Sequence, residues 1–197
     1  MDSAGEKVFA RAERKNVRVR SPLDAWLAGK LSCDRKELSR EKLWAYQKAR
    51  LIDTLQWALD KSPFYRGRLP QTAASALINA WEELPFTTAD DLRQHGPEFL
   101  CLSQSEIVRV VTLDTSGTTG QPKRLYFTGE DQAATVDFFA AGMSTLVNRG
   151  DRVLILLPGE SAGSVGDLLA QALKRQGIEA VLHGPVCDPA LTLQIMR

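Results

Sequence analysis

Hydrophobic positions recur at helical spacing through most of the first hundred residues. The longest such pattern covers 40–61, where Ser39 is a typical N-cap. Ser62 precedes a proline, and because that position is disfavoured in the α region we expect the helix to end there. The helix should bury one apolar stripe, made of Trp44, Leu51, Ile52, Leu55, Ala58 and Leu59. Other features expected in this part are a helix begun by Ser21-Pro22, a helix over 73–80, and a capping box of Thr88 and Asp91.

From residue 104 the pattern changes to alternating strands and helices. Val and Ile fill 107–113, and 153–157 is a continuous apolar run, typical of a strand covered on both faces. Short joints connect a strand, a helix and the next strand, which favours a parallel sheet with right-handed crossovers. The other elements expected here are a strand over 125–127, a helix from a Thr128–Asp131 capping box to about Asn148, a helix over 163–176, a strand over 178–182 and a last helix from Asp188-Pro189.

These elements predict an α/β fold in which a helical N-terminal region precedes an incomplete, mainly parallel sheet with crossover helices. We expect three parts: a basic arm over 1–20, a mainly helical region over 21–103, and an α/β region over 104–197. A parallel sheet usually continues by adding strands, so we expect the sequence to be the N-terminal portion of a longer protein.

Composition excludes several classes of protein. The 197 residues are 44% hydrophobic and 25% charged, as in ordinary globular proteins, and no apolar run approaches the roughly 20 residues of a membrane span. The first residues lack the apolar core of a secretory signal, so we expect a cytoplasmic protein without a membrane partner. Residues 1–50 carry 13 Lys/Arg against 7 Asp/Glu, but no aromatic residue lies between Arg11 and Arg20 to stack on bases. Nucleic acid is therefore not an expected partner.

Metal and disulfide chemistry are not indicated either. Cys33, Cys101 and Cys187 are odd in number and far apart, and His95 and His183 are the only histidines. Neither a disulfide framework nor a Cys/His metal centre is predicted, and the cysteines should be buried or incidental thiols.

The candidate chemistry lies between the strands over 107–113 and 125–127, in the sequence DTSGTTGQPK that ends at Lys123. Glycines let successive backbone N–H groups form an anion-binding nest, hydroxyls add donors, and the lysine adds a mobile positive charge. A polyphosphate suits this set. Pro122 and Arg124 flank the lysine, which excludes a Walker loop, and no G-x-G-x-x-G precedes a helix.

The nine residues TSGTTGQPK resemble the phosphate loop of the adenylate-forming superfamily, which comprises acyl-CoA synthetases, aryl-CoA ligases and peptide-synthetase adenylation domains. Arg124 stands where that superfamily commonly has glycine. Upstream, SPFY at 62–65 and LPFTT at 84–88 resemble the phenylacetate-CoA ligase branch, and the likeness extends over about 43–127. The resemblance implies the N-terminal subdomain of an adenylate-forming enzyme.

The activity that this resemblance implies is that of an ATP-dependent, AMP-forming acid–thiol ligase. A small carboxylic acid, aryl or otherwise hydrophobic, would attack the α-phosphorus of ATP, and a thiol, usually that of coenzyme A, would then displace AMP. Lys123, as the catalytic residue, and Mg²⁺ would share the charge that builds on the departing pyrophosphate. The implied ATP-binding residues are Thr115, Ser116, Gly117, Thr118, Thr119, Gly120 and Lys123.

Two downstream features have alternative interpretations. The segment 158–164 follows a strand where open α/β sheets bind ligands, and it either lines the carboxylate pocket or is a plain strand-to-helix loop. His183 either faces the same crevice or has a structural role, and we favour the structural role because single histidines usually have one.

Three functional hypotheses follow. The first is the N-terminal portion of a carboxylate-activating ligase, inactive alone because the adenine and ribose sites, the metal-binding acid and the C-terminal domain lie in a missing C-terminal part. The second is a non-catalytic nucleotide- or acyl-binding module that keeps the loop. The third is an interaction module that uses the helical, basic N-terminal half, with a homodimer as one form.

Overall fold

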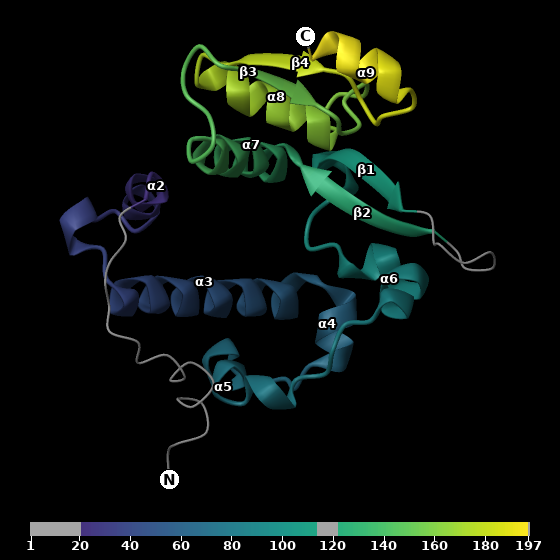
Figure 1. Cartoon of the computed structure of the whole chain (residues 1–197). Helices are drawn as coiled ribbons and strands as arrows, with labels where there is room; N and C mark the ends of the chain where they lie inside the picture. Colours follow the sequence, from purple (N-terminus) through teal and green to yellow (C-terminus); the bar gives the residue numbers. More distant parts are fainter. Residues whose placement is uncertain (1–20, 114–121, 197) are drawn as a thin grey trace. The chain divides into compact units, whose positions relative to one another are not determined.

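The computed structural model describes residues 21–113 and 122–196, and the statements below concern these residues (Figure 1). By their contacts they form two compact units, one of residues 36–126 and one of residues 21–35 together with 127–196. The boundaries predicted at residues 20 and 103 mark regions of the sequence and stay predictions. No helix in the described ranges is long and apolar enough to cross a membrane.

The first unit is built on α3 (Arg40–Lys61), the predicted long helix. The Ser39 hydroxyl accepts a hydrogen bond from the Lys42 amide at 3.2 Å, which confirms the predicted N-cap. Along the same part of the chain follow α4 (Pro63–Arg68), α5 (Ala74–Asn79), α6 (Ala89–His95), β1 (Ile107–Leu113) and β2 (Lys123–Thr128), with 3-10 turns at Arg35–Glu37, Trp81–Glu83, Gly96–Phe99 and Gln104–Glu106.

The apolar stripe of α3 is buried only toward its C-terminal end, so the prediction of one continuous buried stripe is wrong. Leu59 packs with Leu69 and Leu77 in the core of this unit, because α4 and α5 contact that end of the helix. Trp44, several turns before this cluster, is 44% exposed. The ammonium of Lys48 lies 5.2 Å from the centre of its ring and supplies a cation–π contact there.

The strands β1 and β2 pair with each other and run in opposite directions (Figure 1). The strand predicted over 107–113 is confirmed, and the one predicted over 125–127 extends to Lys123–Thr128. The pair therefore brackets residues 114–121, which carry the candidate loop.

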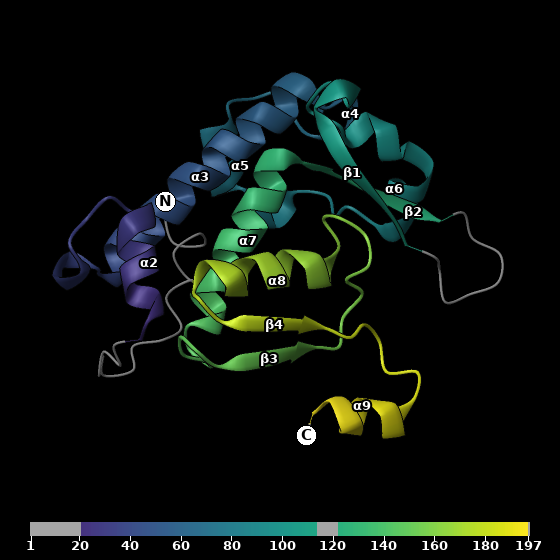
Figure 2. The same cartoon turned by 90° about the horizontal axis from the view of Figure 1, so that it is seen from above.

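The second unit contains the predicted strand–helix–strand succession. Strand β3 (Arg152–Ile155) pairs in parallel with β4 (Glu179–Leu182), in the register Arg152 to Glu179, and α8 (Val165–Arg175) connects them. Figure 2 shows α8 running along this pair, with α7 beside it. The buried residues Ile155, Leu173 and Ile178 form the core between helix and sheet. The α/β class is confirmed, and the described strands form two separate pairs. The remaining helices of this unit are α2 (Leu23–Lys30), α7 (Gly129–Met143) and α9 (Pro189–Ile195).

Two details of this unit differ from the prediction. The run 153–157 is not covered on both faces, because the strand ends at Ile155 and the side chains of Leu156 and Leu157 are 41% and 43% exposed. Alternate residues of a strand point to opposite faces, so α8 covers the face of Ile155 and not that of Leu156. Helix α7 ends at Met143 rather than near Asn148, because the amides of Thr145 and Leu146 bond to carbonyls three residues back and tighten the chain into a turn.

Candidate functional site

The candidate phosphate loop connects the ends of β1 and β2. Thr115, Ser116, Gly117, Thr118, Thr119 and Gly120, to which the sequence assigns ATP binding, lie outside the described residues. Lys123 is described: it is the first residue of β2 and is half-buried. Arg124 follows it and is exposed, and strand geometry places these two cations on opposite faces of β2.

A cavity of about 280 Å³ lies beside the start of β2, within the first unit. It is open to solvent and is lined by residues of α6, of the 3-10 turn that follows α6, of β2 and of the position before β2. The lining residues are Leu92, Arg93, Gly96, Pro97, Pro122, Arg124 and Tyr126.

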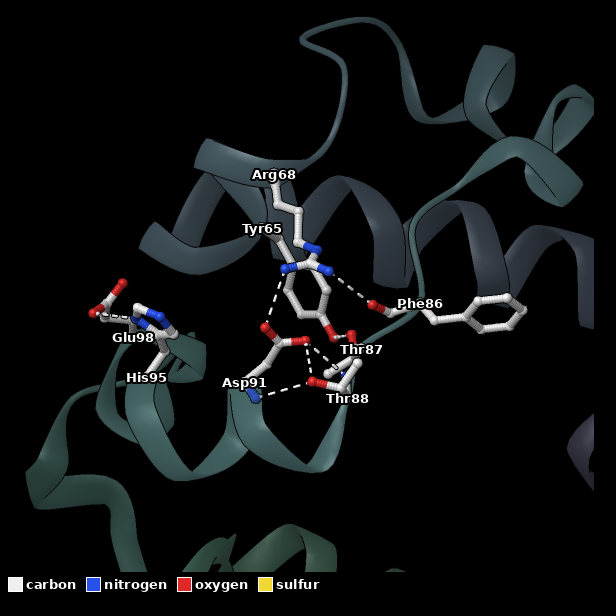
Figure 3. Close-up of polar contacts among 8 residues, drawn as sticks. All are labelled: Tyr65, Arg68, Phe86, Thr87, Thr88, Asp91, His95 and Glu98. Atoms are coloured by element: carbon white, nitrogen blue, oxygen red, sulfur yellow. Dashed lines mark hydrogen bonds and ion pairs between the residues drawn. The ribbon is translucent and has the colours of Figure 1, made fainter.

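The two upstream segments that resemble the phenylacetate-CoA ligase branch contact each other in the first unit (Figure 3). The Tyr65 hydroxyl lies 3.1 Å from the Thr87 hydroxyl. Arg68 joins them a second time, since its guanidinium donates to the Asp91 carboxylate at 3.1 Å and to the Phe86 carbonyl at 3.0 Å. Segments 62–65 and 84–88 therefore hold each other in place. Arg68 of α4, which the sequence analysis did not single out, adds two further bonds to the second segment and to α6.

Beneath these contacts, the junction of α3 and α4 is closely packed. Ser62 is fully buried, and its hydroxyl donates to the Glu98 carbonyl at 2.8 Å and accepts from the Tyr65 amide at 3.3 Å. Phe64 stacks on Phe99 with ring centres 4.0 Å apart. The segment 62–65 thus ends one helix, begins the next and forms part of the core, which is a structural role.

The capping box predicted for Thr88 and Asp91 is confirmed. The Thr88 amide and hydroxyl donate to the Asp91 carboxylate at 2.7 and 2.8 Å, and the Asp91 amide donates to the Thr88 hydroxyl at 3.1 Å. These bonds favour the ionised carboxylate and hold the pKa of Asp91 below its ordinary value, with a smaller contribution from the charge of Arg68.

Asp91 should therefore make folding sensitive to acid. Because its pKa is lower in the folded chain, the stabilisation is fully present above the unfolded pKa and is lost as the pH falls through the folded pKa, from about pH 5 downward. We expect Asp91→Asn to lower the free energy of unfolding at neutral pH and to show a smaller acid dependence than wild type. Urea unfolding at several pH values measures this. Asp53→Asn, on an exposed part of α3, is the control and should leave the acid dependence as in wild type; parallel pH curves for wild type and Asp91→Asn would contradict the prediction.

The segment 158–164 leads from β3 into α8 in the second unit. The Gly166 amide donates to the Pro158 carbonyl at 2.8 Å, and the Gly163 amide donates to the Asp167 carboxylate at 2.7 Å. Ser164 is the N-cap residue of α8, but its buried hydroxyl makes no hydrogen bond with a described residue. Several polar groups of the segment thus already make hydrogen bonds within the second unit. A role of the segment in the carboxylate pocket stays a prediction.

His183 has structural contacts on both ring nitrogens. Nδ1 lies 3.0 Å from the Gly184 carbonyl and Nε2 lies 3.0 Å from the hydroxyl of Thr192, a buried residue of α9. These contacts match the structural role that the sequence analysis favours. The three cysteines are free thiols, and the described ranges contain no group of three or more His, Cys, Asp or Glu side chains that could hold a metal.

Comparison with known proteins connects these features to a family. No family model matches the chain. A phenylacetate-coenzyme A ligase of Thermus thermophilus is 31% identical over 112 residues, which are 54% of this chain and 25% of that protein. The nine-residue loop and this relative are both similar to the adenylate-forming superfamily. The named relative is of the phenylacetate-CoA ligase branch, which the two upstream segments also resemble.

Solved structures show the corresponding fold. An open conformation of 2-hydroxyisobutyryl-CoA ligase, in complex with 2-HIB-AMP and CoA, matches 80% of this chain with a TM-score of 0.62 at 20% identity. The same ligase in the thioesterification state matches 75% of the chain with a TM-score of 0.59 at 23% identity. The chain spans 38% and 33% of those two structures, and about a quarter of the curated relative.

Proposed function

We propose that this chain is a member of the adenylate-forming superfamily and provides the ATP-binding, N-terminal portion of an AMP-forming acid–thiol ligase. The observation that carries the proposal is the nine-residue loop from Thr115 to Lys123, set between the two paired strands β1 and β2. The named relative and the solved neighbour are both CoA ligases, and the neighbour is described with an acyl-adenylate and CoA. These names support ATP, a carboxylic acid and coenzyme A as the substrates.

The proposed reaction has two steps. A carboxylate oxygen of the acid attacks the α-phosphorus of ATP, the bond to the β-phosphate oxygen breaks, and pyrophosphate leaves with the electron pair. The thiolate of coenzyme A then attacks the acyl carbon of the adenylate, and AMP leaves with a thioester formed. An aryl or other hydrophobic acid is proposed because such substrates belong to the branch that the chain resembles.

The chain's part in the first step is to hold the phosphates and to neutralise charge. Backbone N–H groups and hydroxyls of Ser116, Gly117, Thr118, Thr119 and Gly120 would bind the β- and γ-phosphates. Lys123, at the first position of β2, would place its ammonium against the charge that develops on the departing pyrophosphate. Mg²⁺ brought with ATP would share this charge with Lys123.

Nucleotide binding tests the role of Lys123. We expect Lys123→Ala to weaken the binding of a non-hydrolysable ATP analogue about tenfold or more, since it removes a charge-assisted contact to phosphate. Lys123→Arg should keep part of the affinity. Calorimetric titration measures this, and Lys61→Ala, which removes the same charge at the end of α3, is the matched control. If wild type and Lys123→Ala, both folded, bind the ATP analogue with equal affinity, Lys123 does not contact the phosphates.

We further propose that these 197 residues do not complete catalysis alone, since the chain spans about a quarter of its curated relative. Incubation with ATP, Mg²⁺ and a panel of carboxylates should release no pyrophosphate above background, while the ATP analogue still binds. Sustained pyrophosphate release would overturn this part of the proposal. A non-catalytic nucleotide-binding or interaction module remains the alternative function. If the native protein, containing every residue that its reading frame encodes, also released no pyrophosphate, that alternative would be favoured.

A further inference from the structure

We propose that the cavity between α6 and the start of β2 binds a phosphate group through Arg93 and Arg124. The site lies wholly on described residues of the first unit and does not depend on the loop binding ATP. It therefore goes beyond the proposed function. Arg124, the residue that departs from the resemblance at the end of the loop, is part of its lining.

The guanidinium of Arg93 has a hydrogen-bond donor without an acceptor among the described residues. One terminal nitrogen of its guanidinium pairs with the Asp90 carboxylate on the same helix. Its Nε atom is buried and has no hydrogen-bond partner among the described residues. A buried N–H group without an acceptor costs free energy, and native structures usually satisfy such a group with water, an ion or a ligand. The Arg93 guanidinium lines the cavity, so an anion bound there would lie beside this charge and could accept from its N–H groups.

Arg124 brings a second positive charge to the same cavity. It is exposed, and its side chain makes no hydrogen bond or ion pair with another described residue. Tyr126, two residues further along β2, points to the same side of the strand and adds a phenol that can donate a hydrogen bond. None of the lining residues named above carries a carboxylate. Asp90, the partner of Arg93, has a side chain 74% exposed, so water screens much of its charge.

The chemistry of the lining favours phosphate over other ligands. A guanidinium presents several N–H donors in a planar fork that matches two oxygens of a phosphate, and two such forks with a phenol can serve all its terminal oxygens. The volume of about 280 Å³ lies just below the roughly 300–1,000 Å³ typical of sites for whole drug-sized ligands, so the cavity suits one phosphate-bearing end of a molecule. That end could belong to ATP or to a phosphorylated acceptor, and the two share this chemistry.

Titration of the whole chain with inorganic pyrophosphate tests the proposal. We expect Arg124→Ala and Arg93→Lys each to weaken binding about tenfold, the loss typical of a charge-assisted hydrogen bond, and the effect should shrink in high salt. Arg50→Ala, which removes an exposed arginine of α3 outside the cavity, should bind as wild type does. Far-UV circular dichroism and a thermal melt establish that each variant is folded, and lysine is chosen at position 93 because it keeps the positive charge beside Asp90.

Two further variants separate this site from the loop. If Ser116→Ala and Lys123→Ala weaken ATP binding while Arg124→Ala leaves pyrophosphate binding unchanged, the loop is the ATP site as proposed and the proposed arginine site is wrong. If Arg124→Ala weakens pyrophosphate binding and the loop variants do not, the arginine site stands and the proposed function loses its support. Parallel titrations with ATP and with adenosine 3′,5′-bisphosphate show which molecule supplies the phosphate. Only the molecule whose phosphate occupies this cavity should bind more weakly to Arg124→Ala than to wild type. Absence of pyrophosphate binding to the wild-type chain would also overturn the site.

Discussion

Replacing Gly166 with alanine is expected to lower the free energy of unfolding of the second unit by about 2–3 kcal/mol, in the upper part of the range measured for overpacked sites. Gly166 lies in the first turn of α8. A Cβ atom there would come within 2.7 Å of the Pro158 carbonyl oxygen, 2.9 Å of the Leu157 carbonyl oxygen and 3.0 Å of the Gly159 Cα. All three are backbone atoms, which cannot move aside as the end of a flexible side chain can.

The same contact explains why the chain needs glycine there. The Gly166 amide donates to the Pro158 carbonyl at 2.8 Å, so the start of α8 is in direct backbone contact with the chain just after β3. An alanine would separate them and weaken this hydrogen bond. The substitution should therefore also displace the segment 158–164, the candidate wall of a carboxylate pocket.

Gly142→Ala on α7 is the matched control. Nothing lies within 4 Å of a Cβ placed at Gly142, and alanine has the better helix propensity, so this variant should be stabilised by up to about 1 kcal/mol. Chemical denaturation followed by circular dichroism measures both changes. A Gly166→Ala variant as stable as wild type would show that α8 does not approach residues 157–159 as closely as the structure indicates.

The parts of the fold that the sequence predicts well are those that short stretches of chain determine. The Ser39 cap, the two capping boxes and the parallel crossover from β3 to β4 depend on residues a few positions apart or on a single strand–helix–strand succession. The exposure of Trp44 and Leu156 could not be predicted in this way. It depends on which neighbours cover a helix or a sheet, and periodicity reports only that a residue is apolar.

The same distinction holds for the candidate sites. The phosphate loop is a continuous string of nine residues, and its composition alone suggests an anion. Arg93 and Arg124 are 31 positions apart, on a helix and on a strand, and no local pattern connects them. Only the packing of α6 near β2 brings them to one cavity. The sequence did single out Arg124, because an arginine stands there where the resembled superfamily commonly has glycine.

Truncation of Leu173 to alanine is expected to destabilise the second unit by about 2–5 kcal/mol, the range measured for buried leucines. The Leu173 side chain of α8 is fully buried and packs with Ile155 of β3 and with Ile178, just before β4. It therefore fills the space between the crossover helix and both strands, and the cavity left by alanine would loosen the frame that holds the segment 158–164. Such a loss is a large share of the roughly 5–15 kcal/mol that stabilises a typical protein. Leu193→Ala on α9, where the side chain is 57% exposed, makes the same chemical change and should alter stability by less than about 0.5 kcal/mol. Equal losses in the two variants, measured by urea unfolding, would show that Leu173 is not the centre of the core that joins α8 to its sheet.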